Sequence, residues 1–321
     1  MSRPKVLISN GEIPEKGLNL LKEKCDLIIC PELPYPLRAD ILKRVKGVDA
    51  IFWFTKVKLD KEMMDEAGET LKVVGTMSAG YDHIDIAELK RRGILVGNTP
   101  NVLASAVAEI AVGLIIAAAR RFHEGQMALM ANSWNTGGPQ WMLGMEVRGS
   151  TVGIVGLGGI GQAVARRLQS FEVGRIIYCG HSPKKEGDAI GAEFVTLEKL
   201  LQESDFVIVS CPLTPETKGM FNDEAFSKMK KTAILINVAR GDLVDQDALV
   251  RALSEGKIWA AGLDVMNPEP LPSNHPLTSL KNCFLTPHLG SATVITRQDM
   301  AMLTARNILC GLEGKPLPAP L

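Results

Sequence analysis

One stretch of the chain, residues 151–169 with the sequence TVGIVGLGGIGQAVARRLQ, constrains the fold more than any other. Strand-forming residues lead directly into a GxGxxG pattern that begins at Gly156, and a helix-forming segment follows. In this setting Gly156 allows a tight turn, Gly158 lets the backbone approach a diphosphate, and Gly161 lets the helix pack closely on the strand. The N–H groups at the helix start favour phosphate binding. The stretch therefore predicts a dinucleotide-binding unit.

Short apolar runs alternate with helical segments over the rest of the chain, which predicts parallel sheets covered by helices on both faces. We expect strands at 5–9, 26–29, 48–54, 71–75, 94–96, 175–179, 206–210, 233–238, 259–265 and 283–285. We expect helices at 14–24, 37–46, 61–66, 86–91, 102–121, 197–203, 223–229, 246–255 and 294–311. Residues 125–149 show no strong period and are expected to be irregular.

Charge and composition argue against several classes of partner. The 36 basic and 36 acidic residues cancel, so we expect no nucleic acid partner. The N-terminal segment lacks the apolar core of a signal peptide, and the apolar stretch 102–119 contains Ser105 and Glu109. We therefore expect no membrane span. The six cysteines show no CxxC spacing, which favours free thiols in the cytoplasm and no metal site.

Three polar residues follow predicted strands in the second half of the chain, namely Arg240, Glu269 and His288. Ligands of parallel sheets bind outside the carboxyl ends of the strands, so the three loops are expected to meet where a nicotinamide would lie. A guanidinium matches a carboxylate with a planar fork, and an imidazole can deliver a proton to a carbonyl oxygen. A carboxylate beside the imidazole fixes its tautomer and favours its charged form. The set predicts reduction of a 2-oxo acid.

Each of these residues alone has a plainer interpretation. A loop arginine is usually solvated, a histidine is more often structural than catalytic, and Glu269 lies between two prolines that could form a simple turn. The three matching positions together favour catalysis.

Several motifs resemble the D-isomer-specific 2-hydroxyacid dehydrogenase family. They are the glycine pattern, NVARGDLVD, AAGLDVMNPEPLPSNHPL and LTPHLGSAT, while LKVVGTMSAGYDHID and EPLPSNHPL resemble the animal glyoxylate/hydroxypyruvate reductases within it. The resemblance implies two doubly wound α/β domains with a cleft between them. A flavodoxin-like substrate domain would comprise residues 1–101 and 294–321, and a Rossmann-type NAD(P) domain residues 102–293. It also implies reduction of glyoxylate and hydroxypyruvate to glycolate and D-glycerate.

The same resemblance implies roles for individual residues. Arg240 would hold the substrate carboxylate, Glu269 would support His288, and His288 would act as acid and base. Further substrate contacts are expected from Ala79, Gly80, Ser291 and, out of a partner subunit, Trp141. Cofactor contacts are expected from Gly156, Gly158, Gly159, Ile160, Gly161, His181, Ser182, Lys184, Pro212, Val238, Asp264 and Gly290.

The residues after the strand at 175–179 bear on the choice of cofactor. NAD-binding units commonly place an acid there for the ribose 2′-hydroxyl, but this strand continues as GHSPKK without one. A 2′-phosphate would meet no like charge, so we expect NADPH and regard NADH as less favoured. A merely solvated basic turn is the alternative.

The segment 125–149 carries Trp134 and Trp141, which serve either core packing or subunit contact. We expect a homodimer in which Trp141 reaches the partner's site, as the resemblance also implies. Two other readings remain. One is a phosphoglycerate or formate dehydrogenase relative, the former disfavoured because no regulatory extension follows residue 321. The other is a nucleotide-gated corepressor-like binding protein, which would be expected to carry partner-binding extensions.

Overall fold

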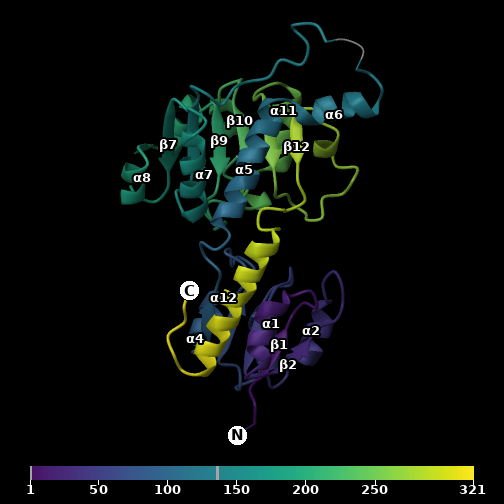
Figure 1. The fold of residues 1–321 in the computed structure, drawn as a ribbon, viewed down its shortest axis with the longest axis vertical. Helices are drawn as coiled ribbons and strands as arrows, with labels where there is room; N and C mark the ends of the chain where they lie inside the picture. The colour runs from purple at the N-terminus through teal and green to yellow at the C-terminus, as the bar shows by residue number, and fades with distance from the viewer. Residues whose placement is uncertain (1, 135–136) are drawn as a thin grey trace. The chain divides into compact units, whose positions relative to one another are not determined.

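The computed structural model describes residues 2–134 and 137–321. The chain divides into two compact units, the first made of Met1–Leu103 with Ala292–Leu321 and the second of Ala104–Ser291. Each unit contains one parallel sheet with helices packed against it (Figure 1). The α/β fold with two parallel-sheet domains, as predicted, is confirmed.

The first unit has a five-stranded parallel sheet in the order β2-β1-β3-β4-β5. This is the flavodoxin-like order, in which helices cross over on both faces. The strands are β1 (Lys5–Ile8), β2 (Asp26–Ile29), β3 (Ala50–Trp53), β4 (Val73–Thr76) and β5 (Leu95–Gly97). The helices are α1 (Glu15–Lys22), α2 (Arg38–Arg44), α3 (Lys61–Ala67), α4 (Ile86–Arg91) and α12 (Val294–Leu312).

Helix α12 packs into the first unit although it comes last in the sequence (Figure 1). A Cβ atom on Gly17 of α1 would lie 2.8 Å from Ala301, so the two helices are in close contact. Asn307 Nδ2 donates to the carbonyl oxygen of Asn98 at 3.0 Å, and Asn307 Oδ1 accepts from the Ala319 N–H at 3.0 Å. Buried amide hydrogen bonds thus fix the C-terminal segment against the end of β5.

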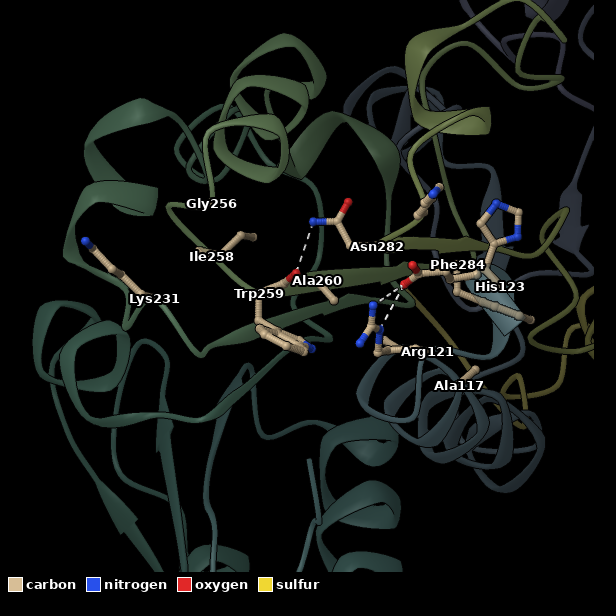
Figure 2. A pocket seen from close by; sticks show the side chains of 13 residues that line it. Ala117, Arg121, His123, Lys231, Gly256, Ile258, Trp259, Ala260, Asn282 and Phe284 are labelled. Atoms are coloured by element: carbon tan, nitrogen blue, oxygen red, sulfur yellow. Dashed lines mark hydrogen bonds and ion pairs between the residues drawn. The ribbon is translucent and has the colours of Figure 1, made fainter. Parts of the chain in front are cut away.

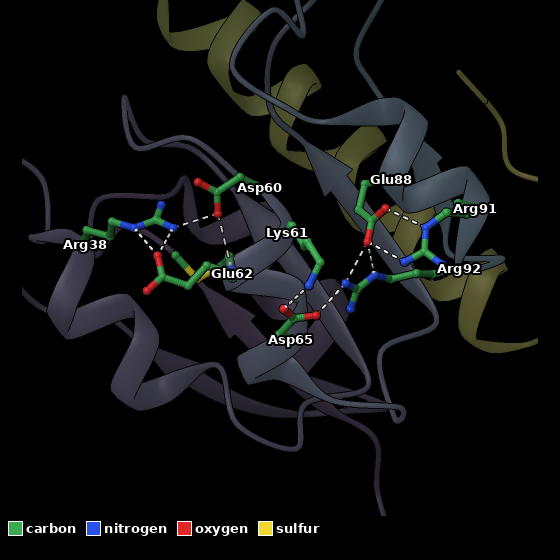
Figure 3. Close-up of polar contacts among 9 residues, drawn as sticks. Arg38, Asp60, Lys61, Glu62, Asp65, Glu88, Arg91 and Arg92 are labelled. Atoms are coloured by element: carbon green, nitrogen blue, oxygen red, sulfur yellow. Dashed lines mark hydrogen bonds and ion pairs between the residues drawn. The ribbon is translucent and has the colours of Figure 1, made fainter.

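A surface cluster of charges joins helices α3 and α4 (Figure 3). Glu88 accepts from the guanidinium groups of Arg91 and Arg92, which lowers the pKa of the Glu88 carboxyl to about 2. Arg92 also pairs with Asp65 at 2.5 Å, and Asp65 pairs with Lys61 at 2.6 Å. The cluster therefore links residues of two helices that are 27 positions apart in the sequence.

The second unit has a seven-stranded parallel sheet in the order β12-β11-β10-β9-β6-β7-β8. The strands are β6 (Thr151–Val155), β7 (Arg175–Cys179), β8 (Ala192–Phe194), β9 (Phe206–Val209), β10 (Ile234–Asn237), β11 (Ala260–Leu263) and β12 (Cys283–Leu285). The α-helices are α5 (Ala104–Ala119), α6 (Phe122–Met130), α7 (Gly159–Gln169), α8 (Lys185–Ala189), α9 (Leu197–Glu203), α10 (Asp223–Lys228) and α11 (Gln246–Ser254), with 3-10 turns at Gly241–Leu243 and Pro276–Thr278. The order reverses beside β6, where dinucleotide-binding sheets hold their ligand.

Two predictions about residues 102–149 are wrong in detail. Helix α5 ends at Ala119 rather than at residue 121, because Arg121 adopts a left-handed conformation with φ of 56°. Residues 122–130 then form α6, within a stretch expected to be irregular from residue 125. The sequence of α6 shows no apolar period that would predict a helix, and none of its residues is buried. Helix α8 and strand β8 were also not expected, since both are short.

No helix in the described part of the chain is long and apolar enough to cross a membrane.

Candidate active site

The glycine-rich turn lies between β6 and α7, as the pattern predicts. Gly156 has a φ of +94°, which favours glycine, and a Cβ there would lie 2.8 Å from the Cα of Cys211. A Cβ on Gly161 would lie 2.4 Å from the carbonyl oxygen of Gly156, so only glycine lets α7 approach the turn so closely. A Cβ on Gly158 would have no neighbour within 4 Å. The turn is therefore tight on its inner side and open at Gly158.

This geometry fits a dinucleotide diphosphate. Gly159 and Ile160 form the first turn of α7, where backbone N–H groups have no acceptor within the helix. The open space at Gly158 lies at that helix start. Helix N-termini with room beside them bind phosphate through N–H groups and the helix dipole.

The loop after β7 carries the residues that were expected to contact the ribose phosphate. His181, Ser182 and Lys184 are all exposed. The Lys184 N–H donates to Tyr178 Oη at 2.8 Å, which anchors the loop to its own strand. In the loop after β9, the pKa of Glu216 is lowered chiefly by a hydrogen bond from Thr214 and, to a lesser extent, by the charge of His181.

His288 and Glu269 come together although they are 19 residues apart in the sequence. His288 Nδ1 lies 2.8 Å from Glu269 Oε2, and the Met266 N–H donates to Glu269 Oε1 at 3.1 Å. The Glu269 side chain is 19% exposed, whereas that of His288 is 46% exposed. The carboxylate is thus held at both oxygens, and the imidazole presents its second nitrogen, Nε2, away from this hydrogen bond.

Asp264 holds the loop that carries His288. It follows β11 and is 1% exposed. Asp264 Oδ1 accepts from Thr286 Oγ1 at 2.6 Å and from the Leu289 N–H at 2.7 Å, and Oδ2 accepts from the Gly290 N–H at 2.7 Å. His288 itself has a φ of 55°, an uncommon conformation for a residue with a side chain. The buried carboxylate therefore stabilises a strained backbone at His288.

Arg240 lies at the end of β10, in a loop that packs against the loop after β11. A Cβ on Gly241 would lie 2.2 Å from the backbone of Met266, so the two loops are in direct contact. Asn267 extends the contact, since its Nδ2 donates to Asp242 Oδ1 at 2.8 Å. Arg240 is half-buried, and its Nη1 donates to the carbonyl oxygen of Ala239 at 2.9 Å. The loops that carry Arg240 and Glu269 are thus fixed to one another.

The remaining residues expected at this edge also follow strands of the seven-stranded sheet. Pro212 is exposed in the loop after β9, and Val238 is buried directly after β10. Gly290 and Ser291 follow His288, and a Cβ on Gly290 would lie 3.0 Å from Asp264 Oδ2. All of these positions lie at the carboxyl ends of parallel strands, on the same side as the glycine-rich turn.

Ala79 and Gly80 belong to the first unit, in the loop after β4. Their carbonyl oxygens are occupied, because Asn98 Nδ2 donates to that of Ala79 at 2.8 Å and Ser78 Oγ donates to that of Gly80 at 2.7 Å. Within residues 2–134 and 137–321, no hydrogen bond from the Ala79 or Gly80 N–H is found. The loop is therefore held by its carbonyl groups, and these two N–H groups have no acceptor among the described residues.

Trp141 stacks on Trp134 with ring centroids 6.2 Å apart and planes 11° from parallel. Both indoles are exposed. Neither is packed into the core of the second unit, so core packing, one of the two interpretations drawn from the sequence, does not describe them here.

A cavity of about 430 Å³ lies in the second unit, at the edge opposite the predicted site (Figure 2). It is bordered by the residues that precede β11 and β12, including Trp259 and Asn282, and by the start of α6. Arg121 at this cavity pairs with Glu124 at 2.7 Å. Because the glycine-rich turn and His288 lie at the carboxyl ends of the strands, this cavity is not the candidate active site. The described residues contain no cluster of side chains suited to a metal ion.

The family follows from a direct comparison. Residues 112–290 match a family model described as the NAD binding domain of D-isomer specific 2-hydroxyacid dehydrogenases. The chain belongs to this family. Its members are NAD(P)-dependent oxidoreductases, so the resemblance seen in the motifs is confirmed.

Individual relatives are similar over most of their length. The chain is 49% identical over 288 residues to the glyoxylate reductase/hydroxypyruvate reductase of Homo sapiens, covering 89% of this chain and 88% of that one. It is 46% identical to a glyoxylate reductase of Thermofilum pendens, covering 99% and 94%. A crystal structure of an NADPH-dependent glyoxylate/hydroxypyruvate reductase from Sinorhizobium meliloti, in complex with NADP and malonate, is 34% identical with a TM-score of 0.85, covering 100% and 97%.

Two features of this family member's site were not anticipated from the sequence. Asp264 was expected as a cofactor contact, but its role in holding the His288 loop was not foreseen. An acid directly after the buried strand sequence AAGL was the available signal, because a buried carboxylate needs several donors. The electrostatic effect of His181 on the pKa of Glu216, which follows a different strand, was also not foreseen, and no local pattern predicts it.

Proposed function

We propose that this enzyme reduces glyoxylate and hydroxypyruvate to glycolate and D-glycerate, with NADPH as the preferred reductant. The observation that carries the proposal is the 2.8 Å contact between His288 Nδ1 and Glu269 Oε2 at the carboxyl edge of the NAD-binding sheet. The names of the relatives described above support the choice of substrates.

The dinucleotide would be held by the turn at Gly156–Gly161, with its diphosphate at the start of α7. The tight contacts of Gly156 and Gly161 and the open space at Gly158 support this placement. When bound, the reduced nicotinamide supplies the hydride that reaches the carbonyl carbon of the substrate.

His288 holds the proton that the carbonyl oxygen needs. With Nδ1 directed at Glu269, the proton to be transferred resides on Nε2. The hydrogen bond between Nδ1 and Glu269 fixes the orientation of the ring. Asp264 acts one step further back, as a positioning residue that keeps the left-handed backbone of His288 in place.

The substrate carboxylate is bound by two kinds of donor in this proposal. Arg240 offers a planar fork suited to bidentate hydrogen bonds. The N–H groups of Ala79 and Gly80 offer neutral donors on a loop whose carbonyl groups are already fixed. Each donor set is fixed by the contacts of its own loop, which favours a single orientation of a bound carboxylate. Ser291, directly beyond the His288 loop, is a further proposed contact.

The preference for NADPH rests on the loop after β7. No acid occupies residues 180–185, and the exposed His181, Ser182 and Lys184 offer donors to a 2′-phosphate. The negative charge of Glu216, which interacts with His181, disfavours a 2′-phosphate. We therefore expect a higher kcat/KM for NADPH than for NADH, without complete exclusion of NADH.

The experiment is a comparison of substrates and cofactors. Consumption of NADPH and of NADH is followed at 340 nm with glyoxylate, hydroxypyruvate and pyruvate, formation of the reduced cofactors from NADP⁺ and NAD⁺ is followed with formate, and the configuration of the glycerate product is determined. We expect reduction of glyoxylate and hydroxypyruvate, D-glycerate as product, and a higher kcat/KM for NADPH. Oxidation of formate, or absence of turnover with both oxo acids, would contradict the assignment. Equal kcat/KM for the two cofactors would contradict the NADPH preference alone.

We further propose a cytoplasmic homodimer in which Trp141 lines the partner's active site. Support comes from exposed apolar side chains on α6 and the following segment, which include Phe122, Leu129, Met130, Trp134 and Leu143. Large exposed apolar residues gathered on one segment are typical of an interface. An indole there would form a rigid apolar wall on one side of the substrate side chain. The cytoplasmic location is supported by the free thiols of all six cysteines.

A further inference from the structure

Arg297 is a half-buried cation in the first turn of α12. Its guanidinium carbon lies 5.2 Å from the centroid of the Phe54 ring, so it stacks on an aromatic face. The side chain is half-buried. Across residues 2–134 and 137–321, no carboxylate forms an ion pair with it. Arg297 differs in this respect from Arg91 and Arg92 at the end of α4, which both pair with the carboxylate of Glu88.

This position is unfavourable for an arginine unless an anion binds. The positive end of the helix dipole lies in the first turn of α12 and repels a cation there. Burial lowers the pKa of the Arg297 guanidinium, and Tyr35 opposes this with a smaller effect that raises it. Among the described residues, the buried side-chain atoms that lack a hydrogen-bond partner do not include any nitrogen of Arg297. The guanidinium nitrogens therefore remain accessible to solvent. The group is therefore both poorly compensated and accessible.

Sheet register places this cation near the proposed carboxylate-binding loop. Trp53 of β3 pairs with Thr76 of β4, so the residues that follow them, Phe54 and Met77, leave the sheet side by side. The loop with Ala79 and Gly80 begins there. Lys56, two residues beyond Phe54, lies with its Nζ 5.9 Å from the centroid of the Tyr35 ring and adds a second positive charge to this edge.

We propose that Arg297 is a specificity-determining residue that binds a second acidic group, on C3 of the 2-oxo acid. The inference rests on the proposed function and extends it from monocarboxylic substrates to dicarboxylic 2-oxo acids. The Ala79–Gly80 loop receives the carboxylate next to the reacting carbonyl, and Arg297 receives the other one. A guanidinium on an aromatic face keeps its planar fork free for a carboxylate.

The test compares freshly prepared oxaloacetate with pyruvate, which is the same acid without the second carboxylate. The kcat/KM of each is measured for the unaltered enzyme and for Arg297→Gln, Arg297→Lys and Arg306→Gln. Arg306 is an exposed arginine on the same helix and serves as the matched control. Glyoxylate is measured in parallel, since its reduction tests the proposed function separately.

We expect the unaltered enzyme to favour oxaloacetate over pyruvate, and Arg297→Gln to reduce that ratio by about tenfold to a hundredfold, the usual worth of a charged hydrogen bond. Arg297→Lys should retain part of the preference, and it serves as the test if the glutamine variant does not fold. Arg306→Gln should leave the ratio unchanged. An unaltered enzyme that reduces glyoxylate but treats oxaloacetate and pyruvate alike would overturn the inference and leave the proposed function intact. A uniform loss with all acids in Arg297→Gln would also overturn it, because that result indicates only lost packing on Phe54.

Discussion

Glu269 acts on the substrate only through His288, and this dependence gives a test by substitution. In Glu269→Gln the amide still occupies the space but no longer carries the negative charge 2.8 Å from Nδ1. The hydrogen bond that orients the imidazole is then weaker, so kcat with glyoxylate should fall while the Kd for NADPH stays close to that of the unaltered enzyme. Steady-state rates and a binding titration with NADPH measure the two quantities. An unchanged kcat would remove Glu269 from the proton-transfer step.

Asp264 provides a second test at the level of a single residue. In Asp264→Asn, an amide N–H replaces one oxygen that accepts hydrogen bonds in the His288 loop. Because a buried donor then faces a donor, the free energy of unfolding should fall by about 1–3 kcal/mol. The value of kcat should fall as well, since the strained loop at His288 loses its anchor. Urea unfolding and steady-state rates measure both effects, with the exposed Asp188→Asn as control. An unchanged kcat would contradict the positioning role.

At the scale of elements, the charge cluster between α3 and α4 predicts how stability depends on acid. The pKa of Glu88 is about 2 in the folded protein, below its ordinary value of 4.5, so the cluster stabilises the fold above pH 4.5. Protonation removes that contribution as the pH falls from 4.5 toward 2. Glu88→Gln should therefore lose less stability than the unaltered protein over this range, by a modest amount because exposed pairs are screened.

The urea midpoint at pH 5 and at pH 3 measures this difference for Glu88. Glu69→Gln serves as the control, since Glu69 is exposed and no ion pair of it is found among the described residues. If Glu88→Gln and the unaltered protein lose the same stability between the two pH values, the cluster does not contribute to the folded state.

The elements also show what a sequence can and cannot predict. The strand, glycine turn and helix at 151–169 were predictable because each glycine has a local geometric reason and each element a clear period. Helix α6 was not, because none of its residues is buried and no apolar face marks it. The contact between His288 and Glu269 was expected because both residues follow predicted strands and because the family resemblance implies it, whereas the support of Asp264 required the packed loop itself. Arg297 carries no motif, and its importance depends on Phe54, which is distant in sequence.

For the whole molecule, the proposed dimer can be tested by mixing two impaired variants. Trp141→Ala and Arg240→Ala proteins are unfolded and refolded together. If Trp141 serves the partner's site, each mixed dimer has one site with both defects and one with neither, so activity should rise well above that of either variant refolded alone.

The mixing experiment needs evidence that mixed dimers have formed, for example by native mass spectrometry. If they form and activity does not rise, Trp141 serves its own subunit. A protein that remains monomeric at assay concentration would contradict the dimer itself.

The most direct test of the account concerns the proton held by His288. His288→Asn keeps a polar side chain of similar reach but cannot deliver a proton, and it leaves the glycine-rich turn of the cofactor domain untouched. Reduction of glyoxylate by NADPH is measured together with NADPH binding followed by the fluorescence of the cofactor. Because the proton donor is lost, kcat should fall by about a hundredfold or more, while the Kd for NADPH should stay close to that of the unaltered enzyme. A variant that binds NADPH and still reduces glyoxylate at the original rate would contradict the account.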